Sequence, residues 1–211
     1  MRTEDLIRAL AEDSASIPAA MARRFVIFAL LGGLAAGCMF AFILTPRPDL
    51  SAVIVTPRVA FKFLIALTLV GAAGTLALRM MRPEAQSSLW PVLAPALALL
   101  AFGVTAELIV LPPTAWNPLL IGSNALTCLT LVPLLALPAL GCILAGLRYG
   151  APSHPRLSGM AAGLLAGGMG AALYAMHCPD DSPLFVATWY GLAIAVVATL
   201  GAVLGNRVLR W

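Results

Sequence analysis

Long apolar stretches separated by short polar segments dominate this chain. Six of them are about 20 residues long, which is the length of helix that crosses a hydrocarbon core of about 30 Å. The pattern therefore predicts an all-α membrane protein with six transmembrane helices, preceded by a tail at residues 1–24 and followed by a short C-terminal segment at residues 206–211. The predicted spans are residues 25–45, 59–78, 89–111, 126–147, 157–176 and 184–205.

The composition supports this prediction. The 211 residues are 61% hydrophobic and only 10% charged, whereas charged residues make up about a quarter of an ordinary soluble domain. The net charge of +4 is not gathered in one basic patch, so we expect no direct binding of nucleic acid. The four cysteines form no CxxC pair and there are two histidines, so we expect neither a zinc ribbon nor a haem attachment and no resident cofactor.

The basic residues predict the orientation in the membrane. If the N-terminus is cytoplasmic, ten of the 13 Lys and Arg residues lie on that side, and only Arg47, Arg58 and Lys62 lie on the other. Cytoplasmic loops carry the excess of Lys and Arg in membrane proteins. We therefore expect both termini to be cytoplasmic.

The tail before the first span has the pattern of a short amphipathic helix. A threonine cap and two acidic residues open it, three aliphatic residues line one face, and residues 14–18 are expected to end it. A helix of about ten residues is marginal alone in water. Its acidic residues disfavour an anionic lipid surface, so we favour a groove on a partner protein. The residues expected to contact this partner are Thr3, Glu4, Asp5, Leu6, Ile7 and Leu10.

Predicted depth separates the four cysteines into two pairs. Cys38 and Cys142 lie in apolar sequence within spans, where a thiol normally behaves as a small hydrophobe. Cys128 and Cys178 are both placed at the outer face, and His177 precedes Cys178. Three interpretations stay open for this outer pair: a structural disulfide, a pair that senses oxidants or metal ions with help from His177, and coincidence.

Two charged residues fall inside predicted spans. Lys62 and Glu107 each lie about 5–6 Å below the outer interface, at about 1.5 Å per helical residue, and are predicted to form an ion pair. The alternatives are that Lys62 snorkels to the interface and that Glu107 is a solvated helix end. Neither residue belongs to the chain of intramembrane acids that is typical of an ion pathway.

Glycines recur every four residues in three of the predicted spans. Small residues at this spacing allow helices to approach closely. We expect these faces to serve packing within the chain rather than homodimerisation, and the oligomeric state stays open. The glycines are Gly33 and Gly37, then Gly159, Gly163 and Gly167, and finally Gly201 and Gly205.

Several segments together resemble the NrsF-type family of six-span bacterial membrane anti-sigma factors. They are the opening MRTEDLI, the RPDL loop at residues 47–50, ALYAMHCP at residues 172–179 with the later Trp-Tyr pair at residues 189–190, and the ending RVLRW. The likeness covers the whole chain.

The resemblance implies a regulator in the bacterial inner membrane rather than an enzyme. The cytoplasmic tail would hold an extracytoplasmic-function sigma factor away from RNA polymerase, and a periplasmic stress signal would release it. In such proteins two periplasmic cysteines are associated with the response to metal or oxidative stress, and they map here onto Cys128 and Cys178, where a heavy-metal ion would bind transiently. Two other functions stay open, a quinone-linked membrane thiol oxidoreductase and a small-solute transporter, although the chain lacks a second shuttling thiol pair and any clear repeat between its halves.

Overall fold

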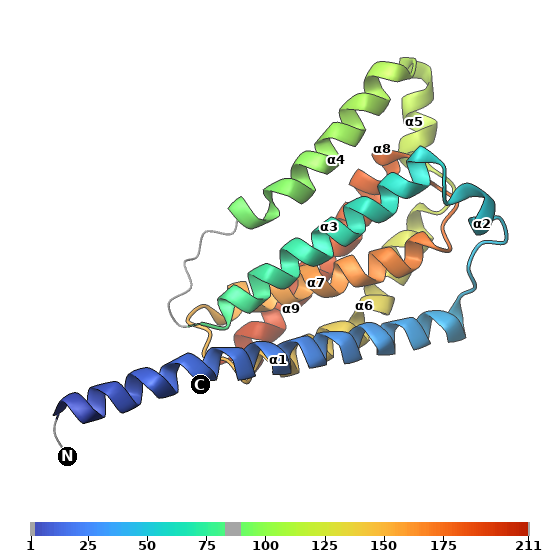
Figure 1. The fold of residues 1–211 in the computed structure, drawn as a ribbon. Coiled ribbons are helices and arrows are strands. Elements are labelled where there is room, and N and C mark those ends of the chain that lie inside the picture. Colours follow the sequence, from blue (N-terminus) through green and yellow to red (C-terminus); the bar gives the residue numbers. More distant parts are fainter. Residues whose placement is uncertain (1–2, 83–89, 211) are drawn as a thin grey trace.

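The chain folds into a bundle of long helices (Figure 1). The computed structural model describes residues 3–82 and 90–210, with side chains described for residues 20–82 and 91–210. Within these ranges the regular structure is entirely helical, without a strand. Six helices within these ranges are long and apolar enough to cross a membrane, which is the predicted number, and each overlaps one of the predicted apolar stretches. They are Ala20–Ile43, Pro57–Met80, Pro91–Val110, Ala125–Leu147, Pro155–Ala175 and Pro183–Val208.

In terms of elements, these spans are the second part of α1 (Thr3–Ile43), then α3 (Pro57–Met80), α4 (Trp90–Val110), α6 (Ala125–Leu147) and α7 (Pro155–Ala175). The sixth span combines α8 (Pro183–Phe185), the π-helical turn η1 (Val186–Tyr190) and α9 (Gly191–Val208). Two connections expected to be plain loops contain the short helices α2 (Leu50–Val53) and α5 (Pro113–Ile121).

The N-terminal tail differs from the prediction. We expected its helix to end between Ser14 and Pro18, but α1 runs without a break from Thr3 to Ile43. Proline in a helix interior costs about 3 kcal/mol. The neighbouring residues are strong helix formers rich in alanine and leucine, and the helix continues directly into a span in which lipid requires backbone hydrogen bonds to be satisfied. The tail is therefore an extension of the first span, and it projects past the ends of the other helices (Figure 1).

The start of α1 and the end of α9 lie at one end of the bundle (Figure 1). We call this the termini end. The opposite, distal end carries the connections at residues 44–56, 111–124 and 176–182. Large apolar side chains on the outward faces of the helices are exposed, for example Leu30 at 68% and Phe102 at 65%. Exposed apolar surface on this scale is costly in water and fits an environment of lipid.

Helix α7 is the centre of the bundle, in contact with α9, α3, α6 and α1. Its closest neighbour is α9, because glycines face glycines there. A Cβ atom added at Gly159 would lie 2.2 Å from the carbonyl oxygen of Gly201, and one added at Gly163 would lie 2.5 Å from that of Val197. The predicted small faces of the fifth and sixth spans are thus confirmed as packing within the chain.

On the first span a different glycine makes the close contact. A Cβ atom at Gly32 would lie 2.9 Å from the Cα atom of Ala139 on α6, whereas Gly37 has nothing within 4 Å and Gly33 meets only the sulfur of Met169. The rotation of α1 against α6 decides which glycines face inward, and spacing alone does not reveal it.

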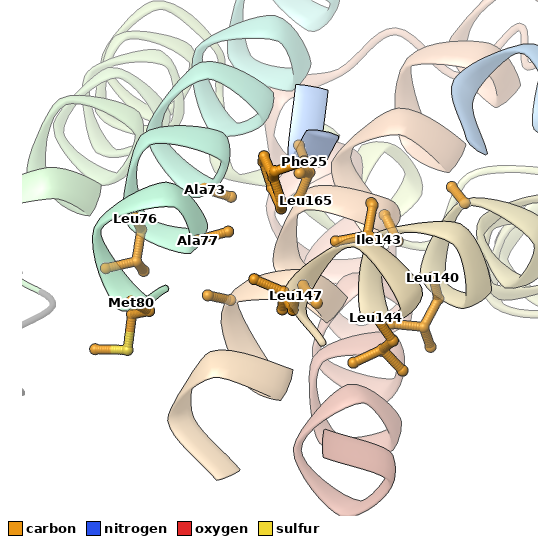
Figure 2. Close-up of a cluster of buried hydrophobic side chains, with 14 of the residues drawn as sticks. Phe25, Ala73, Leu76, Ala77, Met80, Leu140, Ile143, Leu144, Leu147 and Leu165 are labelled. Atoms are coloured by element: carbon orange, nitrogen blue, oxygen red, sulfur yellow. The ribbon is translucent and has the colours of Figure 1, made fainter. Parts of the chain in front are cut away.

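The buried side chains form two clusters. The first joins α1, α3, α6, α7 and α9 toward the termini end, with residues such as Phe25, Leu76, Leu147 and Leu165 (Figure 2). The second lies toward the distal end and holds Cys128 and Cys178 among aromatic residues. We call this second group the distal cluster, and it contains the candidate site.

Candidate functional site

The distal cluster brings together the two cysteines that the sequence singles out. Cys128 lies in the first turn of α6, and Cys178 lies three residues beyond the end of α7. Both are 0% exposed and both are free thiols. Their neighbours in the cluster include Tyr174, Phe185 and Tyr190. The other cysteines lie elsewhere: Cys38 is exposed on α1 and Cys142 is half-buried on α6.

Burial governs the chemistry of Cys178. It raises the pKa of this thiol above its ordinary value of 9.0, while the nearby Lys62 ammonium and the Tyr190 hydroxyl favour the thiolate and oppose that effect. The sulfur donates only a weak hydrogen bond, 4.0 Å long, to the carbonyl oxygen of Asp180. A thiolate is the form that reacts with oxidants and metals, and burial disfavours that form of Cys178.

The His177 side chain contacts the segment that follows α1. Its Nδ1 atom lies 2.7 Å from the carbonyl oxygen of Thr45, so the ring nitrogen donates to that carbonyl. Within the described ranges, no three His, Cys, Asp or Glu side chains are grouped so as to hold a metal ion. The predicted help from His177 in binding a metal ion at Cys178 stays a prediction, and its ring nitrogen is engaged with Thr45.

Lys62 is buried at 1% exposure and has three acceptors. Its Nζ atom donates to the carbonyl oxygens of Cys178 at 2.8 Å and Asp180 at 3.1 Å and pairs with Asp181 Oδ1 at 3.0 Å. The predicted ion pair between Lys62 and Glu107 is therefore wrong, and so is the alternative of a snorkelling side chain. All three ammonium hydrogens are satisfied by the segment that follows α7, which leaves none for Glu107.

Glu107 instead accepts hydrogen bonds from residues at the start of the sixth span. Its Oε2 atom accepts from the Ser182 hydroxyl at 2.5 Å and from the backbone N–H of Leu184 at 3.2 Å. Arg58 lies 2.9 Å from Oε1 as an ion pair, although without the donor angle of a hydrogen bond. The carboxylate is buried, so it is not the solvated helix end that the sequence left open.

Residues 176–182, which we call the Cys178 loop, are held by two aspartates. Asp180 accepts from the backbone N–H groups of Ser123 and Asn124, at 3.2 and 2.9 Å, just before α6 and its Cys128. Asp181 pairs with Lys62 and with Arg47, at 3.0 and 2.8 Å. Sequence reasoning missed both roles, although the adjacent aspartates directly after a predicted outer cysteine were a visible signal.

The Cys178 loop is also bonded to the segment that follows α1. The backbone N–H of Arg47 donates to the carbonyl of Met176 at 2.9 Å, and the Arg47 guanidinium binds Asp181. The guanidinium also binds Asp49 at 2.7 Å, which lowers the pKa of that carboxyl. With the contact from His177 to Thr45, three interactions join residues 45–47 to the loop that carries Cys178.

A cleft of about 680 Å³ opens beside the Cys178 loop at the distal end. It lies between the start of α3, the end of α5 and the loop itself, with Thr56, Pro118 and Asp180 among its lining residues. The two aspartates of the Cys178 loop line this cleft, whereas the buried Cys128 and Cys178 do not.

The predicted partner-binding residues lie far from this site. Residues 3–10 belong to the first turns of α1. Their side chains lie outside the described residues, so contact of Thr3, Glu4, Asp5, Leu6, Ile7 and Leu10 with a partner stays a prediction.

Comparison with known proteins agrees with the architecture. Residues 10–211 match the family described as NrsF, negative regulator of sigma F. The probable anti-sigma-F factor NrsF of Azospira oryzae is 34% identical over 218 residues, and the anti-sigma-F factor NrsF of Caulobacter vibrioides is 37% identical over 215 residues; each comparison covers 100% of both chains. No solved structure matches. The chain, with its six apolar helices and its thiol pair at the distal end, belongs to the NrsF family.

Proposed function

We propose that this protein is an anti-sigma factor of the bacterial inner membrane. It sequesters an extracytoplasmic-function sigma factor through its N-terminal tail, and it releases that factor when metal or oxidative stress modifies Cys128 and Cys178 in the periplasm. The observation that carries the proposal is the bonding of the Cys178 loop to residues 45–47. These residues directly follow α1, whose other end is the tail.

The orientation follows from charge. Placing the termini end in the cytoplasm puts ten of the 13 basic residues there, in accord with the retention of Lys and Arg on that side. The tail then reaches a cytoplasmic sigma factor, and the distal end faces the periplasm, where oxidants and metals arrive before they enter the cell.

The chemistry at the distal end is that of a thiol pair. A soft divalent metal binds both sulfurs and displaces their two protons. A hydroperoxide oxidises the two thiols to a disulfide, and its O–O bond breaks to give water and an alcohol. Either reaction changes the packing around Cys128 and Cys178 and so moves the Cys178 loop. Residues 45–47 move with it, because they are bonded to this loop.

The coupling energy that this requires is modest. Release of the sigma factor by tenfold takes a difference of about 1.4 kcal/mol between the affinities of the two states. Repacking one buried side chain commonly changes stability by 1–3 kcal/mol. One or two altered contacts between the Cys178 loop and residues 45–47 are thus of the required size.

A cysteine experiment tests the sensing step. Cells carry a reporter driven by the sigma factor and either the chain with Cys128→Ser and Cys178→Ser or a matched control with Cys38→Ser and Cys142→Ser. We expect cadmium or hydrogen peroxide to induce the reporter in the control but not in the distal variant. Normal induction in the distal variant by every metal and oxidant would refute sensing at this pair.

A tail experiment tests sequestration separately. Deleting residues 2–16 from the full chain should abolish co-purification of the sigma factor and leave the reporter permanently active. If the sigma factor still co-purifies with the shortened chain, the tail is not its binding site.

A third experiment tests the connection between the two ends. Arg47→Met removes the guanidinium that binds Asp181, and Arg58→Met, at the other distal arginine, is the control. We expect the Arg47 variant to hold the sigma factor but to release it several-fold less on stress. Unchanged release would show that the signal does not pass through the pair of Arg47 and Asp181.

A further inference from the structure

Two buried hydroxyl groups in the distal cluster have no hydrogen-bond partner. They belong to Tyr174, which is 0% exposed, and Tyr190, which is 3% exposed. Most buried hydroxyls in proteins are hydrogen-bonded, and one left without a partner requires an explanation. Here there are two, with ring centroids only 5.8 Å apart.

Both hydroxyls belong to residues placed around Cys178. Tyr174 lies one helical turn before it, and its carbonyl accepts the backbone N–H of Cys178 at 3.0 Å. Tyr190 lies on η1, and π-helical turns occur often at functional sites. Both tyrosines belong to the same buried cluster as Cys128 and Cys178.

A positive charge completes the surroundings. The Nζ atom of Lys62 lies 5.6 Å from the centroid of the Tyr190 ring and is bonded to the carbonyl of Cys178 itself. Lys62 comes from α3, so a cation and two O–H groups from three separate elements lie in the surroundings of Cys178. The titratable groups packed around this sulfur are Lys62, Cys128, Tyr174, Asp180 and Tyr190.

This arrangement suits a sulfur anion better than a neutral thiol. Neutral thiol sulfur is a weak acceptor of hydrogen bonds, which explains why the hydroxyls have no partner while Cys178 is protonated. A thiolate is a strong acceptor, because hydrogen bonds to charged groups are roughly twice as strong as neutral ones. Loss of the proton therefore creates the acceptor that the two hydroxyls lack.

We propose that Tyr174 and Tyr190 are positioning residues of the sensor, whose hydroxyls donate to the sulfur of Cys178 when it loses its proton to a base in solution. The proposal rests on the sensing function proposed above and adds the groups that activate the thiol. Together with the charge of Lys62, the hydroxyls set how readily Cys178 becomes the thiolate that binds a soft metal or attacks a hydroperoxide.

The infrared S–H stretching band of Cys178 tests this directly. Full-length protein in lipid vesicles, with Cys38, Cys128 and Cys142 changed to Ala, is titrated with base until the band disappears. In Tyr190→Phe or Tyr174→Phe, we expect the midpoint to rise by about one pH unit, a tenfold loss in acid dissociation, which is the effect of one hydrogen bond to a charged group.

The control is Tyr149→Phe, since Tyr149 packs on Phe28 and Arg24 rather than on a thiol, and its midpoint should equal that of the parent. Both phenylalanine variants keep the ring, and either one alone decides the question if the other fails to fold. Midpoints equal to that of the parent, or a band in the parent that persists to the alkaline limit, would overturn the proposal.

The chain with all four cysteines provides a second measurement. With Tyr190→Phe, the cadmium concentration that releases half of the sigma factor should rise about tenfold; an unchanged concentration contradicts the role of the hydroxyl in sensing. The proposal of sensing at the cysteines and the proposal for the tyrosines can be refuted independently. If Cys128→Ser and Cys178→Ser leave induction intact, sensing fails, while the infrared titration still reports whether the tyrosines stabilise the Cys178 anion.

Discussion

The glycine contact between α7 and α9 gives a prediction whose size follows from the structure. In Gly159→Ala, the new Cβ atom would lie 2.2 Å from the carbonyl oxygen of Gly201 and 2.7 Å from the Cα atom of Gly205. Real Cβ atoms essentially never come closer than 3.0 Å to another heavy atom. Both neighbours are backbone, so no side chain can rotate away and the two helices must separate by about 1 Å.

The loss in free energy of unfolding follows from the dispersion attraction that is lost when the two helices separate. A gap of 0.5–1 Å loses a quarter to a half of an attraction of about 0.1–0.2 kcal/mol for each atom pair, and over about thirty pairs along the interface the loss is about 2 kcal/mol. This agrees with the 1–3 kcal/mol typical of overpacked cores. It corresponds to a change of about thirtyfold in the unfolding equilibrium constant.

Reversible unfolding in mixed micelles of increasing SDS content measures this change. The control is Gly71→Ala on α3, because an added Cβ there meets nothing within 4 Å. We expect the control to be as stable as the parent or up to about 1 kcal/mol more stable, since alanine favours helices over glycine. Equal stabilities for Gly159→Ala and Gly71→Ala would refute the close backbone contact between α7 and α9.

Three further outcomes are expected. Burial raises the pKa of Cys178 in the folded state above the ordinary 9.0, so the unfolded chain loses this proton at a lower pH than the folded chain. The contribution of the protonated thiol to the free energy of unfolding is therefore complete below pH 9 and declines as the pH rises from there. Cys178→Ala should flatten this decline in unfolding curves measured at successive pH values. Asp180→Ala removes the acceptor for the N–H groups of Ser123 and Asn124 and should lower the free energy of unfolding by about 1.5–3 kcal/mol, the range for a hydrogen bond to a charged group. Amide exchange should become faster at these two residues, and exchange equal to that of the parent would contradict this role of Asp180. Lys62→Met should lower the free energy of unfolding by about 3–5 kcal/mol, the range for removing one partner of a buried ion pair. Adding Asp181→Asn should recover part of that loss. A loss below about 1 kcal/mol would show that the ammonium group is not needed for stability.

The helices could be predicted from the sequence because their cause is local. The length of an apolar run shows whether it can cross the hydrocarbon core. Lipid offers no hydrogen-bond partners, so the backbone of such a run must form a helix. For the same reason, counting residues predicted that Cys128 and Cys178 lie at the same end of the bundle. Their meeting in one buried cluster agrees with that prediction, but it also needed α6 and α7 to be neighbours.

Side-chain partners could not be predicted in this way. Lys62 and Glu107 lie at similar predicted depths, yet each binds the segment between α7 and the sixth span rather than the other. The sequence determined that this chain has six helices long and apolar enough to cross a membrane, two cysteines toward one end of the bundle and an acidic segment at the start of the chain. Only the tertiary structure decided which donors surround Cys178 and how its loop reaches α1. These contacts depend on which helices are adjacent and how each is rotated, and hydropathy, a property of single segments, holds no information about either.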